Sequence, residues 1–271
     1  MRVRILRIGV VSLLLSGAAE AQHCPSSEAE GTILGCSVVL GTPNIGLEQE
    51  ARAYLYRGRA YIAKRELTLA LDDLTRAIAI SPAMAEAFDE RASAHLAQGE
   101  LALALEDVTQ AIRLEPARAA YYYNRGNIYL QKGEFNSAID DYTVAIRINP
   151  TFALAFLNRG IAAGRSGQLQ QSIADLSEAI KLNDQDAEGY FNRGIAFAVS
   201  RQFERAISDF NEFIRRNPTT ARGYSHRGNV YRELGQTGAA IADFRRAVEL
   251  DPSDDQSKRI LRALGFNANE P

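Results

Sequence analysis

The sequence has few of the side chains that build metal or catalytic centres. It contains two cysteines, three histidines, two methionines and no tryptophan in 271 residues. A structural zinc site needs four ligands, and Cys24 and Cys36 have only His23 near them. A phosphate-binding glycine loop and a nucleophile elbow are also lacking. The sequence therefore predicts no metal, no cofactor and no enzymatic activity.

The chain also lacks a concentration of charge of one sign. It has 31 basic and 33 acidic side chains, which give a formal net charge of −2. Without a cluster of lysine and arginine, the sequence argues against nucleic acid as a partner. The hydrophobic share of 46% and the charged share of 24% are typical of a soluble protein.

The apolar run near the N-terminus is too short to cross a membrane. Residues 1–7 carry three arginines, residues 8–15 are apolar apart from Ser12, and residues 19–21 read Ala-Glu-Ala. This order predicts a signal peptide over residues 1–21 and an exported, bacterial periplasmic protein. A spanning helix needs about 20 apolar residues, although an uncleaved inner-membrane anchor remains the alternative. In an oxidising compartment, Cys24 and Cys36 are expected to form a disulfide, the alternative being two free buried thiols.

What the chain does contain is a period of 34 residues from Ala51 to about Asp254. Small residues share one phase in all six repeats: Gly58, Ala92, Gly126, Gly160, Gly194 and Gly228. A proline stands at the end of five repeats: Pro82, Pro116, Pro150, Pro218 and Pro252. Apolar residues at steps of three, four and seven predict two amphipathic helices per repeat, joined by a turn. One such hairpin cannot bury its own apolar face, so the repeats must stack.

The period predicts an all-α fold, an α-solenoid of six tandem helix-turn-helix repeats with a capping helix at each end. We expect a cap and linker over residues 22–50 and a capping helix and tail over residues 253–271. The expected repeats are 51–84, 85–118, 119–152, 153–186, 187–220 and 221–252.

These repeats resemble the tetratricopeptide repeat (TPR) family. The likeness rests on the small residues at position 8, on tyrosines at position 11 and on aromatic residues at position 4. The aromatic residues at position 4 are Tyr54, Phe88, Tyr122, Phe156, Tyr190 and Tyr224. The resemblance covers about three quarters of the chain. Arg65 and Arg201 replace the usual turn glycine, and Phe213 replaces a small residue. We therefore expect the fifth repeat to be either splayed or repacked.

An arginine precedes the small residue in every repeat, and an aspartate follows it sixteen positions later. The pairs are Arg57 and Asp73, Arg91 and Asp107, Arg125 and Asp141, Arg159 and Asp175, Arg193 and Asp209, and Arg227 and Asp243. A charged ligand site is one interpretation. Because an active site is a single asymmetric arrangement of perturbed groups, a pair copied six times favours a structural ladder between the two helices of each repeat.

The resemblance implies that the first helix of each repeat lines an inner groove. Position 6 of the three central repeats carries Asn124, Asn158 and Asn192. An amide both donates and accepts hydrogen bonds, and this row resembles the asparagine ladder in the TPR domain of O-linked N-acetylglucosamine transferase. The neighbouring groove positions carry Tyr123, Leu157 and Phe191 at position 5, and Asn127, Ile161 and Ile195 at position 9. The pattern predicts binding of an extended peptide.

The predicted function is therefore a non-catalytic adaptor that binds a peptide or protein segment in this groove. The alternative is an assembly scaffold of the cell envelope that works through its outer or terminal surfaces. Position 5 has no lysine in any repeat, so the clamp with which some TPR proteins hold chaperone tails is not expected. The sequence does not identify the partner.

Overall fold

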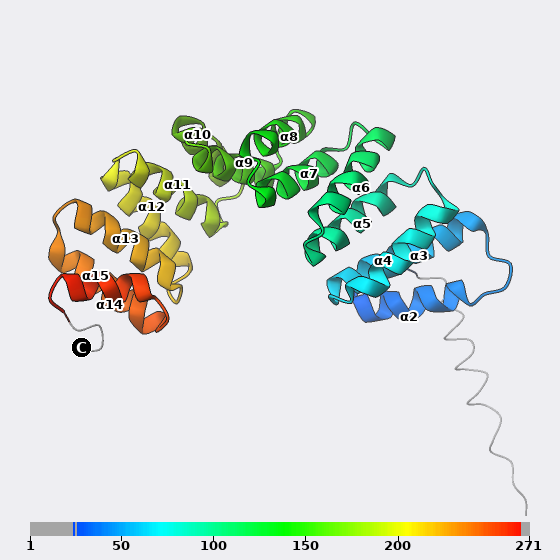
Figure 1. Cartoon of the computed structure of the whole chain (residues 1–271), viewed down its shortest axis with the longest axis horizontal. Coiled ribbons are helices and arrows are strands. Elements are labelled where there is room, and N and C mark those ends of the chain that lie inside the picture. Colours follow the sequence, from blue (N-terminus) through cyan, green and yellow to red (C-terminus); the bar gives the residue numbers. More distant parts are fainter. Residues whose placement is uncertain (1–23, 25, 267–271) are drawn as a thin grey trace, which may run out of the picture. The chain divides into compact units, whose positions relative to one another are not determined.

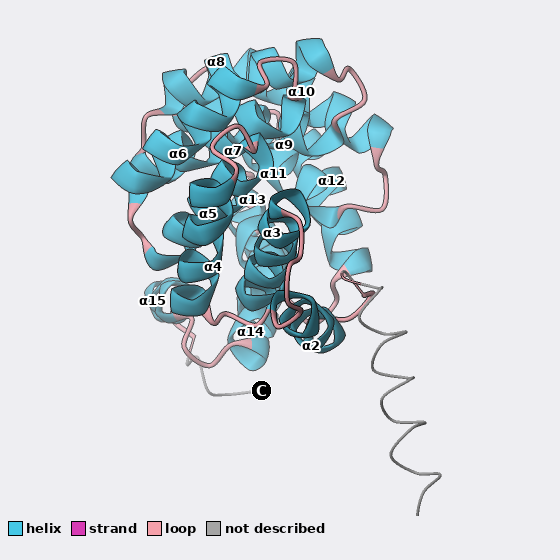
Figure 2. Cartoon of the chain, turned by 90° about the vertical axis from the view of Figure 1, so that its right-hand side faces the viewer, coloured by secondary structure: helices cyan, strands magenta, loops and turns pink. Residues whose placement is uncertain are grey.

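The computed structural model describes Cys24 and residues 26–266, and these residues form helices joined by short loops (Figure 2). The fourteen helices follow in chain order (Figure 1). They are α2 (Ala29–Leu40), α3 (Leu47–Ala63), α4 (Leu67–Ile80), α5 (Ala85–Gln98), α6 (Leu101–Leu114), α7 (Ala119–Lys132), α8 (Phe135–Ile148), α9 (Ala153–Arg165), α10 (Leu169–Leu182), α11 (Ala187–Val199), α12 (Phe203–Arg216), α13 (Ala221–Glu233), α14 (Thr237–Leu250) and α15 (Asp255–Ala263). The chain divides into an N-terminal part, residues 1–128, and a C-terminal part, residues 129–271.

The helices follow the period of the sequence. Second helices begin at the same phase in every repeat, at Leu67, Leu101, Phe135, Leu169, Phe203 and Thr237. Within each part, α3 packs on α4, α5 on α6, α9 on α10, α11 on α12 and α13 on α14. The predicted all-α fold of stacked helical hairpins is confirmed.

The turn between the two helices of a hairpin requires a left-handed backbone conformation. Four repeats place a glycine there, for example Gly133 with a φ of 78°, where the missing Cβ avoids a steric penalty. Arg65 and Arg201 hold the same turn with φ values of 61° and 59°. The turn therefore survives without its glycine in two repeats, at a cost in backbone strain.

The N-terminal cap is a single helix, α2, packed against α3. Cys24 and Cys36 form the predicted disulfide, with their Cα atoms 5.1 Å apart, and Cys36 is fully buried with Val39 and Ala53. The predicted signal peptide lies outside the described residues. Within the described part of the chain, no helix has the length and apolar character needed to span a bilayer.

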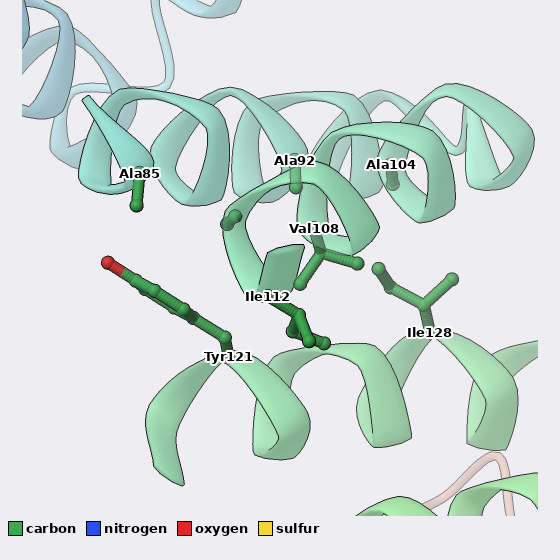
Figure 3. Close-up of a cluster of buried hydrophobic side chains, with 8 residues drawn as sticks. Ala85, Ala92, Ala104, Val108, Ile112, Tyr121 and Ile128 are labelled. Atoms are coloured by element: carbon green, nitrogen blue, oxygen red, sulfur yellow. The ribbon is translucent and has the colours of Figure 1, made fainter. Parts of the chain in front are cut away.

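One core cluster of the N-terminal part is built from buried aliphatic side chains and Tyr121. Val108 and Ile112 of α6 lie between α5 and α7, beside Tyr121 and Ile128 (Figure 3). Ala92 and Ala104 contribute only methyl groups to this cluster, so the helices can approach closely. The small-residue columns of the sequence are therefore packing positions.

The C-terminal part accommodates Phe213 at a position where other repeats have alanine. Its ring is fully buried and lies 4.8 Å from the ring of Phe191. Gly223 of the following helix provides the space, because a Cβ at Gly223 would come 2.8 Å from Cδ1 of Phe213. The predicted repacking of the fifth repeat thus takes the form of a large side chain opposite a glycine.

The C-terminal cap, α15, packs on α14. The carboxylate of Asp254 accepts hydrogen bonds from the backbone N–H and the hydroxyl of Ser257, which caps the start of the helix. Leu261 is fully buried, and the Ser257 hydroxyl lies 3.1 Å from that of Ser225 on α13. These contacts fix α15 against the last hairpin.

Candidate interaction surface

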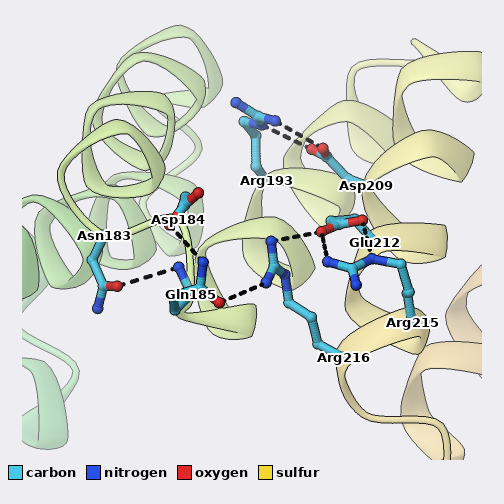
Figure 4. A network of polar contacts seen from close by, with 8 residues as sticks. All are labelled: Asn183, Asp184, Gln185, Arg193, Asp209, Glu212, Arg215 and Arg216. Atoms are coloured by element: carbon cyan, nitrogen blue, oxygen red, sulfur yellow. Dashed lines mark hydrogen bonds and ion pairs between the residues drawn. The ribbon is translucent and has the colours of Figure 1, made fainter.

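The arginine of each repeat forms a two-pronged ion pair with its aspartate. In the fifth repeat, Nε and Nη2 of Arg193 donate to the two carboxylate oxygens of Asp209, both at 2.8 Å (Figure 4). The same geometry holds for Arg57 and Asp73, Arg91 and Asp107, Arg159 and Asp175, and Arg227 and Asp243. Arg125 belongs to the N-terminal part and Asp141 to the C-terminal part, and this sixth pair stays a prediction.

The remaining guanidinium nitrogen reaches a third helix. Nη1 of Arg193 donates to the hydroxyl of Ser177 at 3.1 Å, and Ser177 belongs to the preceding repeat. Equivalent acceptors on the preceding second helix, or on α2, are Ser37, Thr75, Thr143 and Asn211. One arginine thus connects both helices of its own hairpin to the previous one.

The aromatic residue at position 4 lies under this guanidinium. Tyr190 has its ring centroid 5.9 Å from Cζ of Arg193, and the corresponding rings of the other repeats lie at 5.5–5.8 Å. The hydrogen bonds that Arg193 donates to Asp209 outweigh burial and raise the pKa of Arg193 above its ordinary value. Since the aspartates are buried and occupied, this surface offers a ligand little.

The first helices provide another surface, which we call the first-helix face: the residues at positions 2, 5, 6 and 9 of each repeat. Successive first helices touch directly, α3 with α5 in the N-terminal part, and α9 with α11 and α11 with α13 in the C-terminal part. The face is therefore continuous within each part.

Two of the predicted peptide-binding residues belong to this face but are buried within it. Leu157 and Phe191 are 7% and 6% exposed and pack against the second helix of their own repeat. Arg222 covers Phe191, with its guanidinium 4.3 Å from the ring centroid and an ion pair to Glu188. His226 adds an edge contact to Phe191, 5.0 Å between centroids. A ligand has little access to either side chain.

The position-6 amides of the C-terminal part are half-buried at the surface. Asn192 donates one N–H to the carbonyl of Glu188 at 2.8 Å, which fixes its orientation. Its Oδ1 accepts no hydrogen bond that the described residues donate, and one N–H is unused. Asn158 lies one repeat earlier, and Ile161 and Ile195 at position 9 are half-buried beside the amides.

The same face of the N-terminal part is acidic. Nδ2 of Asn124 donates to both carboxylate oxygens of Asp89, at 2.8 and 3.0 Å. Arg59 pairs with Glu86 and Glu90. Burial raises the pKa of Asp89 to about 6, against the opposing effect of the hydrogen bond from Asn124. Tyr123 and Asn127 are half-buried here. The amide of Asn124 is engaged with a carboxylate, so a peptide would have to compete for it.

Comparison with known families now identifies the repeats. Models described as tetratricopeptide repeat match residues 90–151 and 221–254, and one described as TPR repeat matches residues 165–198. The chain is a tetratricopeptide-repeat protein. No curated protein sequence matches it.

Solved TPR structures have the same fold. YrrB, described as a TPR protein with an unusual peptide-binding site, is 24% identical over 71% of this chain and 98% of its own, with a TM-score of 0.60. PilW, described as a type IV pilus biogenesis factor, is 18% identical over 79% of this chain and 99% of its own, with a TM-score of 0.72. Pseudomonas aeruginosa PilF is 18% identical over 81% and 100%, with a TM-score of 0.71. At these identities the likeness concerns the fold.

Sequence reasoning missed two features of this TPR protein. The acceptor column that ends in Ser177 and Asn211 is visible as Thr, Thr, Thr, Ser and Asn at position 25, sixteen residues before the arginine of the next repeat. Because hydroxyls and an amide share the column, it does not stand out as one residue type. The engagement of Asn124 by Asp89 follows from an acid at position 5 of the previous repeat. Among the described residues, no group of three or more His, Cys, Asp or Glu side chains could hold a metal.

Proposed function

We propose that this protein is a non-catalytic interaction module whose first-helix face binds an extended peptide or protein segment. TPR proteins bind proteins and peptides in general, and the C-terminal part has the better surface for it. The observation that carries the proposal is Asn192, which is oriented by its own helix and still has a carbonyl oxygen and an N–H to offer. Asn158, one repeat away, would extend the row along α9 and α11.

An extended segment would exchange backbone hydrogen bonds with these amides. Its alternate side chains would lie on Ile161 and Ile195, because Leu157 and Phe191 are buried. Each hydrogen bond contributes about 1 kcal/mol net, so the affinity is modest and shared among several contacts. In the N-terminal part, Asn124, Tyr123 and Asn127 would offer a surface of the same kind, whose partner must tolerate Asp89 and Glu90. The peptide-binding site of YrrB gives a precedent on this fold.

A photo-crosslinking amino acid placed at Ile195 tests the proposal in the native cell. We expect a crosslinked partner that decreases tenfold or more when Asn158 and Asn192 are both changed to alanine. The matched control carries the crosslinker at Leu103, an exposed residue of the second helix α6. Equal adducts at both positions, or adducts unaffected by the two alanines, would contradict peptide binding on this face.

A scaffold role is the second candidate, and exposed apolar residues at the N-terminal cap favour it. Leu34, Val38 and Leu47 are 63%, 42% and 69% exposed. In that case Leu34→Ser with Val38→Ser should abolish an assembly that Asn158→Ala with Asn192→Ala leaves intact. Size-exclusion chromatography of native complexes distinguishes the two roles.

Export to the periplasm belongs to the same proposal. The disulfide between Cys24 and Cys36 suits an oxidising compartment, and residues 1–21 have the order of a signal peptide. N-terminal sequencing of the protein from fractionated cells should give a start at Gln22 or within two residues of it. A retained Met1 in the membrane fraction would favour the anchored alternative.

A further inference from the structure

A pocket lies between the end of α13, the last of the first helices, and the terminal helix α15. Its volume is about 350 Å³, near the lower end of the range of ligand pockets, roughly 300–1,000 Å³. It is lined by Arg232 of α13 and by Gln256, Arg259, Ile260, Ala263 and Leu264, which belong to α15 or follow it directly. Two cations and three apolar side chains therefore share one small, solvent-open pocket.

Within the described part of the chain, the positive charges of the two arginines are not neutralised by a close ion pair. The side chain of Arg232 is 43% exposed, and its nearest carboxylate, on Glu233, is 3.8 Å away. Arg259 is exposed, donates from Nε to the backbone carbonyl of Asp255, and forms no ion pair among the described residues. The ladder arginines Arg57, Arg91, Arg159, Arg193 and Arg227 differ, because each is bound to a buried aspartate at 2.6–2.8 Å. Arg232 and Arg259 are thus available to an anion.

We propose that this pocket binds an acidic side chain of the segment that occupies the first-helix face, with an apolar side chain of the same segment on Ile260 and Leu264. A guanidinium matches a carboxylate in shape and charge and can hold it through two hydrogen bonds. In an extended segment, residues i and i+2 point to the same side, so one acid and one apolar residue can enter together. Because the pocket is open to solvent, the chain can continue past it. This inference rests on the proposed peptide binding.

The test is a selection from a library of random dodecapeptides displayed through their C-termini, which removes the chain-end carboxylate. With the full-length mature protein as bait, we expect enrichment of Asp or Glu two residues from an apolar side chain. Arg232→Ala with Arg259→Ala should abolish that enrichment. The matched control, Arg246→Ala with Arg262→Ala, removes the same charge from α14 and α15 outside the pocket and should preserve it. Circular dichroism checks that each variant is folded.

Reversing the charge of the two pocket arginines gives a second test. Arg232→Glu with Arg259→Glu should select Lys or Arg where the parent selects acids. Peptides enriched without an acid preference, or the same acids selected by the alanine variant, would overturn the pocket while leaving peptide binding in place. Failure of the parent protein to enrich any peptide above the empty support would overturn the proposed function, and the pocket with it.

Discussion

The guanidinium of Arg193 joins three helices: two nitrogens donate to Asp209 of its own repeat and the third donates to Ser177 of the repeat before. The Asp209 side chain is 7% exposed and that of Arg193 is 20% exposed. Removing one member of a buried pair leaves the other without compensation. These two residues therefore have a larger effect on stability than a surface ion pair does.

Arg193→Ala should lower the free energy of unfolding by about 3 kcal/mol, the lower end of the range for a broken buried pair. Arg193→Lys should recover only part of the loss, because an ammonium lacks the fork that fits Asp209. Urea denaturation followed by circular dichroism measures both. Arg215→Ala, on the exposed side of α12 beside Glu212, is the control and should cost less than 1 kcal/mol. Equal losses at both positions would contradict the structural role.

Gly223→Ala should destabilise the C-terminal part by roughly 1–3 kcal/mol, as overpacking does. The new methyl group would lie 2.8 Å from the Phe213 ring and 2.9 Å from Ile214. Phe213→Ala on its own leaves a cavity, so the double variant should lose less than the sum of the two single losses. Gly238→Ala is the control, since nothing lies within 4 Å of its Cβ position, and a gain of about 0.5–1 kcal/mol is expected. Additive losses would show that the two residues do not share space.

Asp89→Asn should raise stability at pH 7 by about 1–3 kcal/mol, since about two pKa units correspond to nearly 3 kcal/mol. The pKa of Asp89 in the folded protein is about 6, above the ordinary value of 3.8 for an aspartate. The folded protein therefore binds the proton more tightly, and stability falls as pH rises from about 4 through 6. Thermal unfolding of the variant across this range should lack that fall. Asp72→Asn, an exposed acid on α4, should keep it. If the Asp89→Asn variant kept the parent's pH profile of stability, the raised pKa of Asp89 would be contradicted.

Reduction of the disulfide should destabilise the N-terminal cap by roughly 3 kcal/mol, the value expected for a closed loop of this length. Cys24 and Cys36 are twelve positions apart. Alkylation without reduction should modify no thiol, and alkylation after reduction should modify two, as mass spectrometry reports. Cys36→Ser should unfold like the reduced parent and respond no further to reductant. Two modified thiols in the untreated protein would refute the bond.

The helices could be predicted from the sequence because the period repeats six times and each copy corrects the others. How deeply an individual side chain is buried could not be predicted. Position 5 shares a phase with the open face, yet Phe191 and Leu157 turn under it, because their own second helices offer apolar surface at Phe213 and Ala179. Gly223 likewise compensates for Phe213 from the next repeat, which a comparison of one column with itself does not show.

The bond from Arg193 to Ser177 and its equivalents make each hairpin depend on its predecessor. Nearest-neighbour contacts of this kind determine how sharply a repeat protein melts. They also limit how repeats can be recombined: a transplanted hairpin needs a Ser, Thr or Asn at position 25 of whichever repeat comes before it. The first hairpin meets this need through Ser37 of α2, so the N-terminal cap can serve as a starting piece for new arrays that open with an arginine-bearing helix.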